Sequence, residues 1–125
     1  MAADDRKYTK EHEWVMVEGD VATVGVTDYA ASELGDVVFL ELPEAGSPVT
    51  QGDAVGTIET VKSVEDLFSP VTGEVIEVNE DVLDAPETVN ASPMDGGWLF
   101  KVRLDGDADL DELLTADEYQ ALIGG

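Results

Sequence analysis

The 125-residue sequence contains no cysteine, which excludes disulfide bonds, thiolate metal sites and a nucleophilic cysteine. Its single histidine excludes a histidine-rich metal centre, and we expect no metal site. No stretch approaches the roughly 18 apolar residues of a membrane-spanning helix. The first residues lack both an apolar signal segment and the basic character of a transit peptide. We therefore expect a cytoplasmic protein without a leader, in which any redox or group-transfer chemistry depends on an attached group.

Positive charge is also scarce, with 6 Lys and Arg against 29 Asp and Glu and a formal net charge of −23. Binding to nucleic acid or to an anionic membrane needs clustered Lys and Arg, so neither is expected. The acids are spread along the whole chain, which we interpret as the solvated surface of a protein from a salt-adapted prokaryote. Since 43% of the residues are hydrophobic, residues 1–125 are expected to fold as one globular domain.

Most of the sequence is predicted to form short β-strands. Apolar and β-branched residues occur in short runs that are separated by Gly, Pro, Asp and Asn, which is typical of strands joined by turns. The predicted strands cover 14–18, Val21–Val26, 36–42, Ala54–Thr60, 64–69, 74–78 and 98–104. We expect a mainly β fold in which two small sheets form a flattened barrel or sandwich, together with a few short helices.

Short helices are predicted where a capping residue precedes an apolar pattern. Thr27 is expected to cap a helix over Asp28–Leu34 that stops at Gly35. One helical turn is expected near residues 80–83, within a region (79–97) that is otherwise predicted to be loop.

The C-terminal part of the chain has a different pattern, with two capping-box spacings that begin at Asp109 and Thr115. They predict two helices, over 110–114 and 116–123. The fold is therefore expected to end in a helical segment at about 109–123.

Lys62 is the only lysine or arginine between Glu11 and Phe100. It lies between two predicted strands, so the segment of about 54–69 is expected to form a hairpin with this lysine at or beside its tip. A solvated amine suits acylation by another enzyme. It does not suit imine catalysis, which needs a desolvated lysine with a lowered pKa. An ordinary surface lysine in an acidic field is the alternative.

Several blocks of the sequence resemble the glycine cleavage system H protein. They occur in order from residue 7 to about residue 122, at 7–9, 11–15, 24–30, 34–43, 59–64, 69–75, 89–90, 97–99 and 116–119. Thr60 stands where the family often has Ser, and Ser63 where Ala is common. Neither departure changes the chemistry of the hairpin.

The resemblance implies a carrier that is not itself a catalyst, with lipoic acid joined by an amide to Lys62. Such an arm takes a methylamine group from the pyridoxal-phosphate glycine decarboxylase and presents it to the tetrahydrofolate-dependent aminomethyltransferase. Dihydrolipoyl dehydrogenase then reoxidises the arm. A separate lipoate-attaching enzyme would first load the lysine.

Glu13 and Asp66 are candidates for docking the loaded arm. An aminomethyl-lipoyl group carries a protonatable amine, which a groove lined by carboxylates can hold by charge-assisted hydrogen bonds. Glu13 belongs to the family-like segment 11–15, and Asp66 follows Lys62 by four residues. The alternative is that both are ordinary surface acids. His12 is expected to be a surface or packing residue, and Trp14 and Trp98 are expected to be core residues.

Other classes of protein remain as alternatives. A lipoyl or biotinyl carrier of another multienzyme complex would share the hairpin. However, biotinyl carriers place methionine on both sides of the lysine, and the lipoyl domains of 2-oxoacid dehydrogenases usually place Asp before it. Here the neighbours are Val61 and Ser63. An imine-forming enzyme and a purely structural protein complete the alternatives, and the intact mass of the native protein discriminates among all of them.

Overall fold

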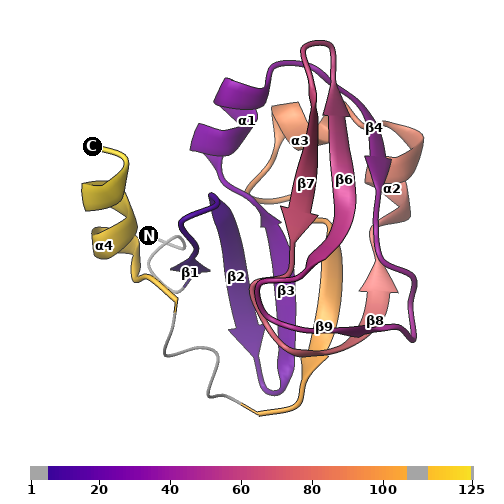
Figure 1. The fold of residues 1–125 in the computed structure, drawn as a ribbon, viewed down its shortest axis with the longest axis vertical. Coiled ribbons are helices and arrows are strands. Elements are labelled where there is room, and N and C mark those ends of the chain that lie inside the picture. Colours follow the sequence, from indigo (N-terminus) through magenta and orange to yellow (C-terminus); the bar gives the residue numbers. More distant parts are fainter. Residues whose placement is uncertain (1–5, 107–112, 125) are drawn as a thin grey trace.

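The computed structural model describes residues 6–106 and 113–124, which form two antiparallel β-sheets and four short helices (Figure 1). The six-stranded sheet has the order β1 (Lys7–Tyr8), β2 (Glu13–Glu18), β3 (Val21–Val26), β9 (Phe100–Leu104), β8 (Gly73–Val78) and β5 (Pro48–Val49). The three-stranded sheet has the order β4 (Val37–Glu41), β6 (Ala54–Thr60) and β7 (Val64–Phe68). The predicted mainly β fold of two small sheets is confirmed.

Among the described residues, the two sheets do not close into a barrel. Strands β1 and β5 are the edges of the larger sheet, and β4 and β7 are the edges of the smaller one. The architecture is therefore an open two-sheet arrangement, and the barrel that we had allowed for is not formed.

One apolar core joins the two sheets. Because side chains alternate between the faces of a strand, the residues on the face that meets the other sheet are the ones that form this core. Val24, Phe100 and Val102 from the larger sheet are in one cluster with Leu40 and Ile58 from the smaller sheet, and all five are almost fully buried. The inner face of the β6–β7 hairpin therefore packs against the larger sheet, while the tip of the hairpin extends beyond the core (Figure 1).

The helices follow the predicted capping residues. Helix α1 (Asp28–Leu34) begins after Thr27, whose Oγ1 accepts a hydrogen bond from the Ala30 amide at 3.1 Å. Helix α4 (Ala116–Leu122) begins with a complete capping box between Thr115 and Glu118. Helix α2 (Glu80–Asp84) includes the predicted helical turn.

Other elements were not predicted. Helix α3 (Thr88–Ala91) lies in the region expected to be loop, and β1 and β5 have only two residues each, too few for a periodic pattern. The last strand begins two residues later than expected. The predicted helix at 110–114 and its cap at Asp109 fall mostly outside the described residues. Of these positions, Leu114 pairs with Tyr8 as an isolated bridge.

No helix in the described part of the chain is long and apolar enough to span a membrane.

Candidate functional site

Lys62 is exposed in the tight turn between β6 and β7, as the sequence predicts. The tip is organised by the buried side chain of Thr60. Its Oγ1 accepts hydrogen bonds from the Lys62 and Ser63 amides, both at 3.1 Å, and donates one to the Ser63 carbonyl at 3.2 Å. The backbone adds a bond from the Thr60 amide to the same carbonyl at 2.8 Å. The tip is therefore a defined turn.

The tip rests on the corner between α1 and β4. The Val61 amide donates to the Asp36 carbonyl at 3.1 Å, and the Nζ of Lys62 donates to the Glu33 carbonyl at 3.1 Å. Glu33 lies in the last turn of α1, where the partial negative charge of the helix end favours a cation. Helix α1 has no basic residue of its own there, so Lys62 supplies this cation.

The side chain of Asn90 fixes the same corner. Its Nδ2 donates to the Gly35 carbonyl at 2.7 Å, and its Oδ1 accepts from the Val37 amide at 2.9 Å. Asn90 lies in α3, in the region that was predicted to be loop. Helix α3 thus supports, through one amide side chain, the corner on which the lysine tip rests.

A cavity of about 460 Å³ extends from Lys62 along the hairpin, and we call it the lysine cavity. Its wall includes both predicted acids, Glu13 and Asp66. Apolar side chains that include Leu34, Ile58 and Phe68 complete much of the lining. The structure therefore brings the three candidate residues to one cavity, although they come from β2, the hairpin tip and β7.

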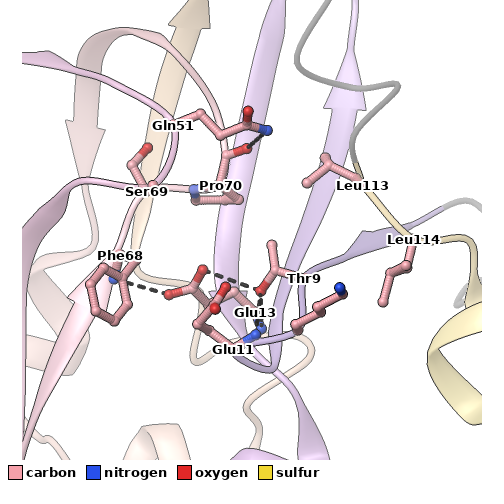
Figure 2. Close-up of a pocket in the computed structure, with 11 residues that line it drawn as sticks. Thr9, Glu11, Glu13, Gln51, Phe68, Ser69, Pro70, Leu113 and Leu114 are labelled. Carbon is pink, nitrogen blue, oxygen red and sulfur yellow. Dashed lines mark hydrogen bonds between the residues drawn. The ribbon is translucent and has the colours of Figure 1, made fainter. Parts of the chain in front are cut away.

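Glu13 is the buried acid of this site, with only 3% of its surface exposed. Its carboxylate accepts a hydrogen bond from the Phe68 amide at 3.0 Å and one from Thr9 Oγ1 at 3.4 Å (Figure 2). Burial raises the pKa of Glu13 from 4.5 to about 8, against the opposing effect of the Phe68 hydrogen bond. Near neutral pH this carboxyl group can therefore gain or lose a proton.

Glu13 also lines a second cavity of about 280 Å³, which Figure 2 shows between the Thr9 turn and the Ser69–Pro70 segment. The two cavities share Glu11, Glu13 and Phe68 in their walls. The carboxyl group of Glu13 thus lies where the space that begins at Lys62 meets a further compartment.

Asp66 has a different environment. It is exposed and lies opposite Thr57 in the β6–β7 ladder, while Leu67, which follows it, is buried against the core. Since successive residues of a strand face opposite sides, Asp66 and Leu67 point to opposite faces of the sheet. Glu65, which sequence reasoning did not single out, lines the same cavity and accepts a hydrogen bond from Ser63 Oγ at 3.0 Å.

His12, Trp14 and Trp98 are packing residues, as expected. His12 has a left-handed backbone (φ +68°), and its Nδ1 lies 2.8 Å from the Tyr119 hydroxyl. Trp14 is buried, and its Nε1 donates to the Pro93 carbonyl at 2.9 Å. Trp98 packs against the cluster formed by Tyr8, Trp14 and Tyr119, and the Nζ of Lys101 lies 5.1 Å from the centre of its ring.

Comparison with known proteins decides the family. The family model for the glycine cleavage H-protein matches residues 6–124. The chain belongs to the glycine cleavage H-protein family. It is 56% identical over 118 residues to the glycine cleavage system H protein of Caulobacter vibrioides, covering 94% of this chain and 98% of that protein. The Staphylococcus epidermidis H protein is 51% identical over 118 residues, with 94% of each chain covered.

The fold agrees with the same family. A crystal structure of a glycine cleavage system H protein from Mycobacterium marinum superposes with a TM-score of 0.90 at 40% sequence identity, covering 98% of each chain. H proteins carry lipoic acid attached covalently to a lysine and act as carriers, not as catalysts. The chain is accordingly a lipoyl carrier of glycine cleavage, which works with glycine decarboxylase and aminomethyltransferase.

Several residues of the site were not predicted. Thr60 was noted only as a departure from the family, and Asn90 only as part of a matching block. The role of Thr60 depends on hydrogen bonds within the tip turn. The role of Asn90 depends on a contact between distant segments, since the bond from the Val37 amide to Asn90 spans 53 residues. The sequence carries no local signal for a contact of that kind.

Proposed function

We propose that Lys62 is the residue that carries the lipoyl group. The observation that supports this most strongly is the exposed lysine at the hairpin tip, which lines the same cavity as the buried acid Glu13. The other described lysines have different settings. Lys101, for example, lies in the middle of β9, 3.7 Å from Glu77 and above the Trp98 ring.

Attachment requires the amine of Lys62 to leave the Glu33 carbonyl and to lose a proton. Its lone pair then attacks the carbonyl carbon of an activated lipoyl group, and the activating group departs as the amide forms. The product has no positive charge at this nitrogen, so its attraction to the end of α1 is lost. The acylated arm is thereby freed to turn into the lysine cavity.

We propose that Glu13, with Asp66 at the rim, docks the loaded arm. The amine of an aminomethyl-lipoyl group would reach Glu13 along the apolar wall of the lysine cavity. A cation at that point favours the ionised carboxylate and forms a charge-assisted hydrogen bond with it. Exclusion of water from the aminomethyl group would slow its hydrolysis.

Asp66 belongs to the proposal as a carboxylate of the cavity wall, with weaker support than Glu13 because it is exposed. The test compares release of formaldehyde and ammonia from the loaded arm in Glu13→Ala, Asp66→Ala and wild-type protein, in high salt. Faster release in either variant supports docking by that residue. Unchanged release in both removes them from the proposal.

Two further partners complete the proposed cycle. Transfer of the methylamine group to the aminomethyltransferase leaves the arm as a dithiol. Its two electrons and two protons must pass to an oxidant before the disulfide can form again, and the flavin enzyme dihydrolipoyl dehydrogenase fills that role. A lipoate-attaching enzyme must precede the first cycle. We propose that residues 1–125 form one lipoyl-carrier domain, which is the substrate both of the attaching enzyme and of the dehydrogenase.

We further propose that the protein works in the cytoplasm of a salt-adapted prokaryote. The support is the net charge of −23, carried by acids along the whole chain. Repulsion among these charges is strong at low ionic strength and is screened at high salt, where the Debye length falls to about 3 Å at 1 M. Urea unfolding in KCl from 0.1 to 3 M should show a large rise in the free energy of unfolding; a flat profile would remove this proposal.

The attachment proposal is tested by glycine cleavage reconstituted with the three partner enzymes. Lys62→Arg keeps the positive charge and cannot form the amide under these conditions, so lipoylation and glycine cleavage should be lost together. Lys10→Arg, at an exposed lysine of the second cavity, is the matched control and should retain both. Full activity of Lys62→Arg would show that another residue carries the group.

A further inference from the structure

Four of the seven exposed large hydrophobic residues in the described part of the chain belong to the three-stranded sheet or to the turn at the tip of its hairpin. They are Val38 (48% exposed), Phe39 (52%), Val61 (67%) and Val64 (62%), and we call them the tip patch. Two come from the edge strand β4, and two flank the lysine at the tip of the hairpin. Single exposed hydrophobic residues are ordinary, but a group of them around one functional side chain marks an interaction site.

A β-bulge produces the exposure of Phe39. The register of β4 against β6 shifts between Val37 and Phe39. Strict alternation would point Val37 and Phe39 to the same side, the core. Instead Val37 and Leu40 are buried, and the two residues between them, Val38 and Phe39, both face solvent. Bulges re-aim side chains in this way, often beside functional sites.

The ladder places acids among these apolar side chains. Phe39 lies opposite Glu59 on β6, which lies opposite Val64 on β7, so the three form one row across the sheet. The next row on the same face consists of Glu41, Thr57 and Asp66, with Thr57 Oγ1 donating to Glu41 at 3.1 Å. Strands β4, β6 and β7 contain no lysine or arginine. The surface around Lys62 is therefore apolar at its centre and negative around it.

We propose that the tip patch is the docking surface for the enzyme that attaches the lipoyl group, an inference that rests on Lys62 being the attachment site. Enzymes that act on the finished arm can gain affinity from the arm itself. The attaching enzyme meets the lysine before the arm exists and must bind the protein surface around it. The complementary face of that enzyme is an apolar depression for Phe39, rimmed by Lys and Arg side chains that pair with Glu59 and Glu41.

The same charges argue against a second copy of this chain as the occupant. Two molecules with a net charge of −23 repel each other, and each would bring the same acids to the contact. A basic rim on the partner removes that repulsion and steers the encounter. In high salt the electrostatic part is screened, and the apolar part retains its strength.

The test measures lipoylation of the unmodified protein by a lipoate–protein ligase with lipoic acid and ATP. Phe39→Ser and Val64→Ser remove apolar surface from the patch, and Leu122→Ser removes a side chain of similar exposure (48%) on α4 as the control. Loss of a central aromatic contact typically costs more than 1 kcal/mol of binding free energy. We expect the KM for Phe39→Ser to rise about tenfold, which corresponds to about 1.4 kcal/mol, with kcat nearly unchanged. Val64→Ser should raise KM less, and Leu122→Ser should leave it unchanged.

Charge reversal tests the proposed basic rim. Glu59→Lys, between Phe39 and Val64, should raise KM at low salt and recover towards the wild-type value as KCl is added. Glu80→Lys, at an exposed acid of α2, is its control. Wild-type KM in Phe39→Ser and Val64→Ser, or an equal rise in Leu122→Ser, would overturn the docking surface. Absence of a lipoyl group from Lys62 in the wild-type product would instead overturn the attachment site, so the two failures are distinguishable.

Discussion

The hydroxyl group of Tyr119 lies 2.8 Å from Nδ1 of His12, so helix α4 is joined directly to the turn that precedes Glu13. The same hydroxyl lies 2.7 Å from Oγ1 of Thr27, the residue that caps α1. The Tyr119 ring is stacked on Tyr8 with a centroid distance of 4.7 Å. His12 holds an unfavourable left-handed backbone (φ +68°), and such a conformation persists only where its surroundings enforce it. The C-terminal helix provides part of that enforcement beside the proposed docking acid.

Tyr119→Phe should therefore destabilise the protein while preserving the stack on Tyr8. The change removes the hydroxyl from two partners and leaves their polar groups short of a hydrogen bond, which typically costs about 1–3 kcal/mol. Denaturant unfolding in high salt measures the loss. Tyr29→Phe, at a partly exposed tyrosine next to His12, is the control and should change the free energy of unfolding by less than about 0.5 kcal/mol. Equal stability of the two variants would contradict a structural role for the Tyr119 hydroxyl.

Thr60→Val should disorder the lysine tip without removing any apolar volume. Valine has nearly the same shape but lacks the hydroxyl that binds the Lys62 and Ser63 amides. We expect faster amide hydrogen exchange at residues 61–63 and a loss of about 1–2 kcal/mol in the free energy of unfolding. Thr60→Ser keeps the hydroxyl and should restore slow exchange. If the valine variant exchanges as slowly as the wild type, the hydroxyl does not organise the turn.

Asn90→Ala should loosen the corner between α1 and β4. The variant leaves the Gly35 carbonyl and the Val37 amide without their side-chain partner, at a cost of about 1–3 kcal/mol. Because the tip rests on this corner, the exchange of the Val61 amide, which donates to Asp36, should also accelerate. Asn79→Ala is a comparison at a buried asparagine, whose Nδ2 donates to the Gly96 and Trp98 carbonyls away from the hairpin. It should destabilise the fold without a selective effect on Val61; an identical exchange pattern in both variants would argue against the proposed support of the tip.

Glu13→Gln should change how stability depends on pH. Burial raises the pKa of Glu13 from 4.5 to about 8, so between these values the folded chain holds a proton that the unfolded chain has lost. Stability associated with this residue is therefore highest below pH 4.5, declines as pH rises, and reaches its lowest level above pH 8. The full decline amounts to roughly 3–5 kcal/mol.

The measurement is urea unfolding of wild-type and Glu13→Gln protein at pH 5 and pH 9 in the same high salt. Glutamine cannot ionise, and the acidic surface is otherwise identical in the two proteins. The stability of the wild type relative to the variant should fall between the two pH values. A constant difference would mean that Glu13 is already ionised in the folded protein at pH 5, so that its pKa is not raised by burial.

Features set by nearby residues could be predicted from the sequence. Thr27 and Thr115 cap helices through bonds to amides three residues away, and the hairpin follows from two strands that flank a short turn at Lys62. The features that were missed depend on long-range pairing. The contact between His12 and Tyr119 spans 107 residues, and α3 is a four-residue helix with no side-chain cap.

The two acids of the site also show which features could be predicted from the sequence and which depend on the fold. Sequence reasoning selected both Glu13 and Asp66, but only the fold shows that Glu13 is buried with a raised pKa while Asp66 is exposed. Likewise, the exposure of Phe39 depends on a bulge in β4. An alternating pattern of apolar residues indicates a strand and does not reveal where its register shifts.

The most direct test of the account is mass spectrometry of proteolytic peptides from the native protein, isolated from cells that make lipoic acid. The peptide that contains Lys62 should carry the mass of one lipoyl group, fragmentation should place it on the Lys62 side chain, and every other lysine should be unmodified. A native, active protein with an unmodified Lys62, or with the lipoyl group on a different lysine, would contradict the central claim.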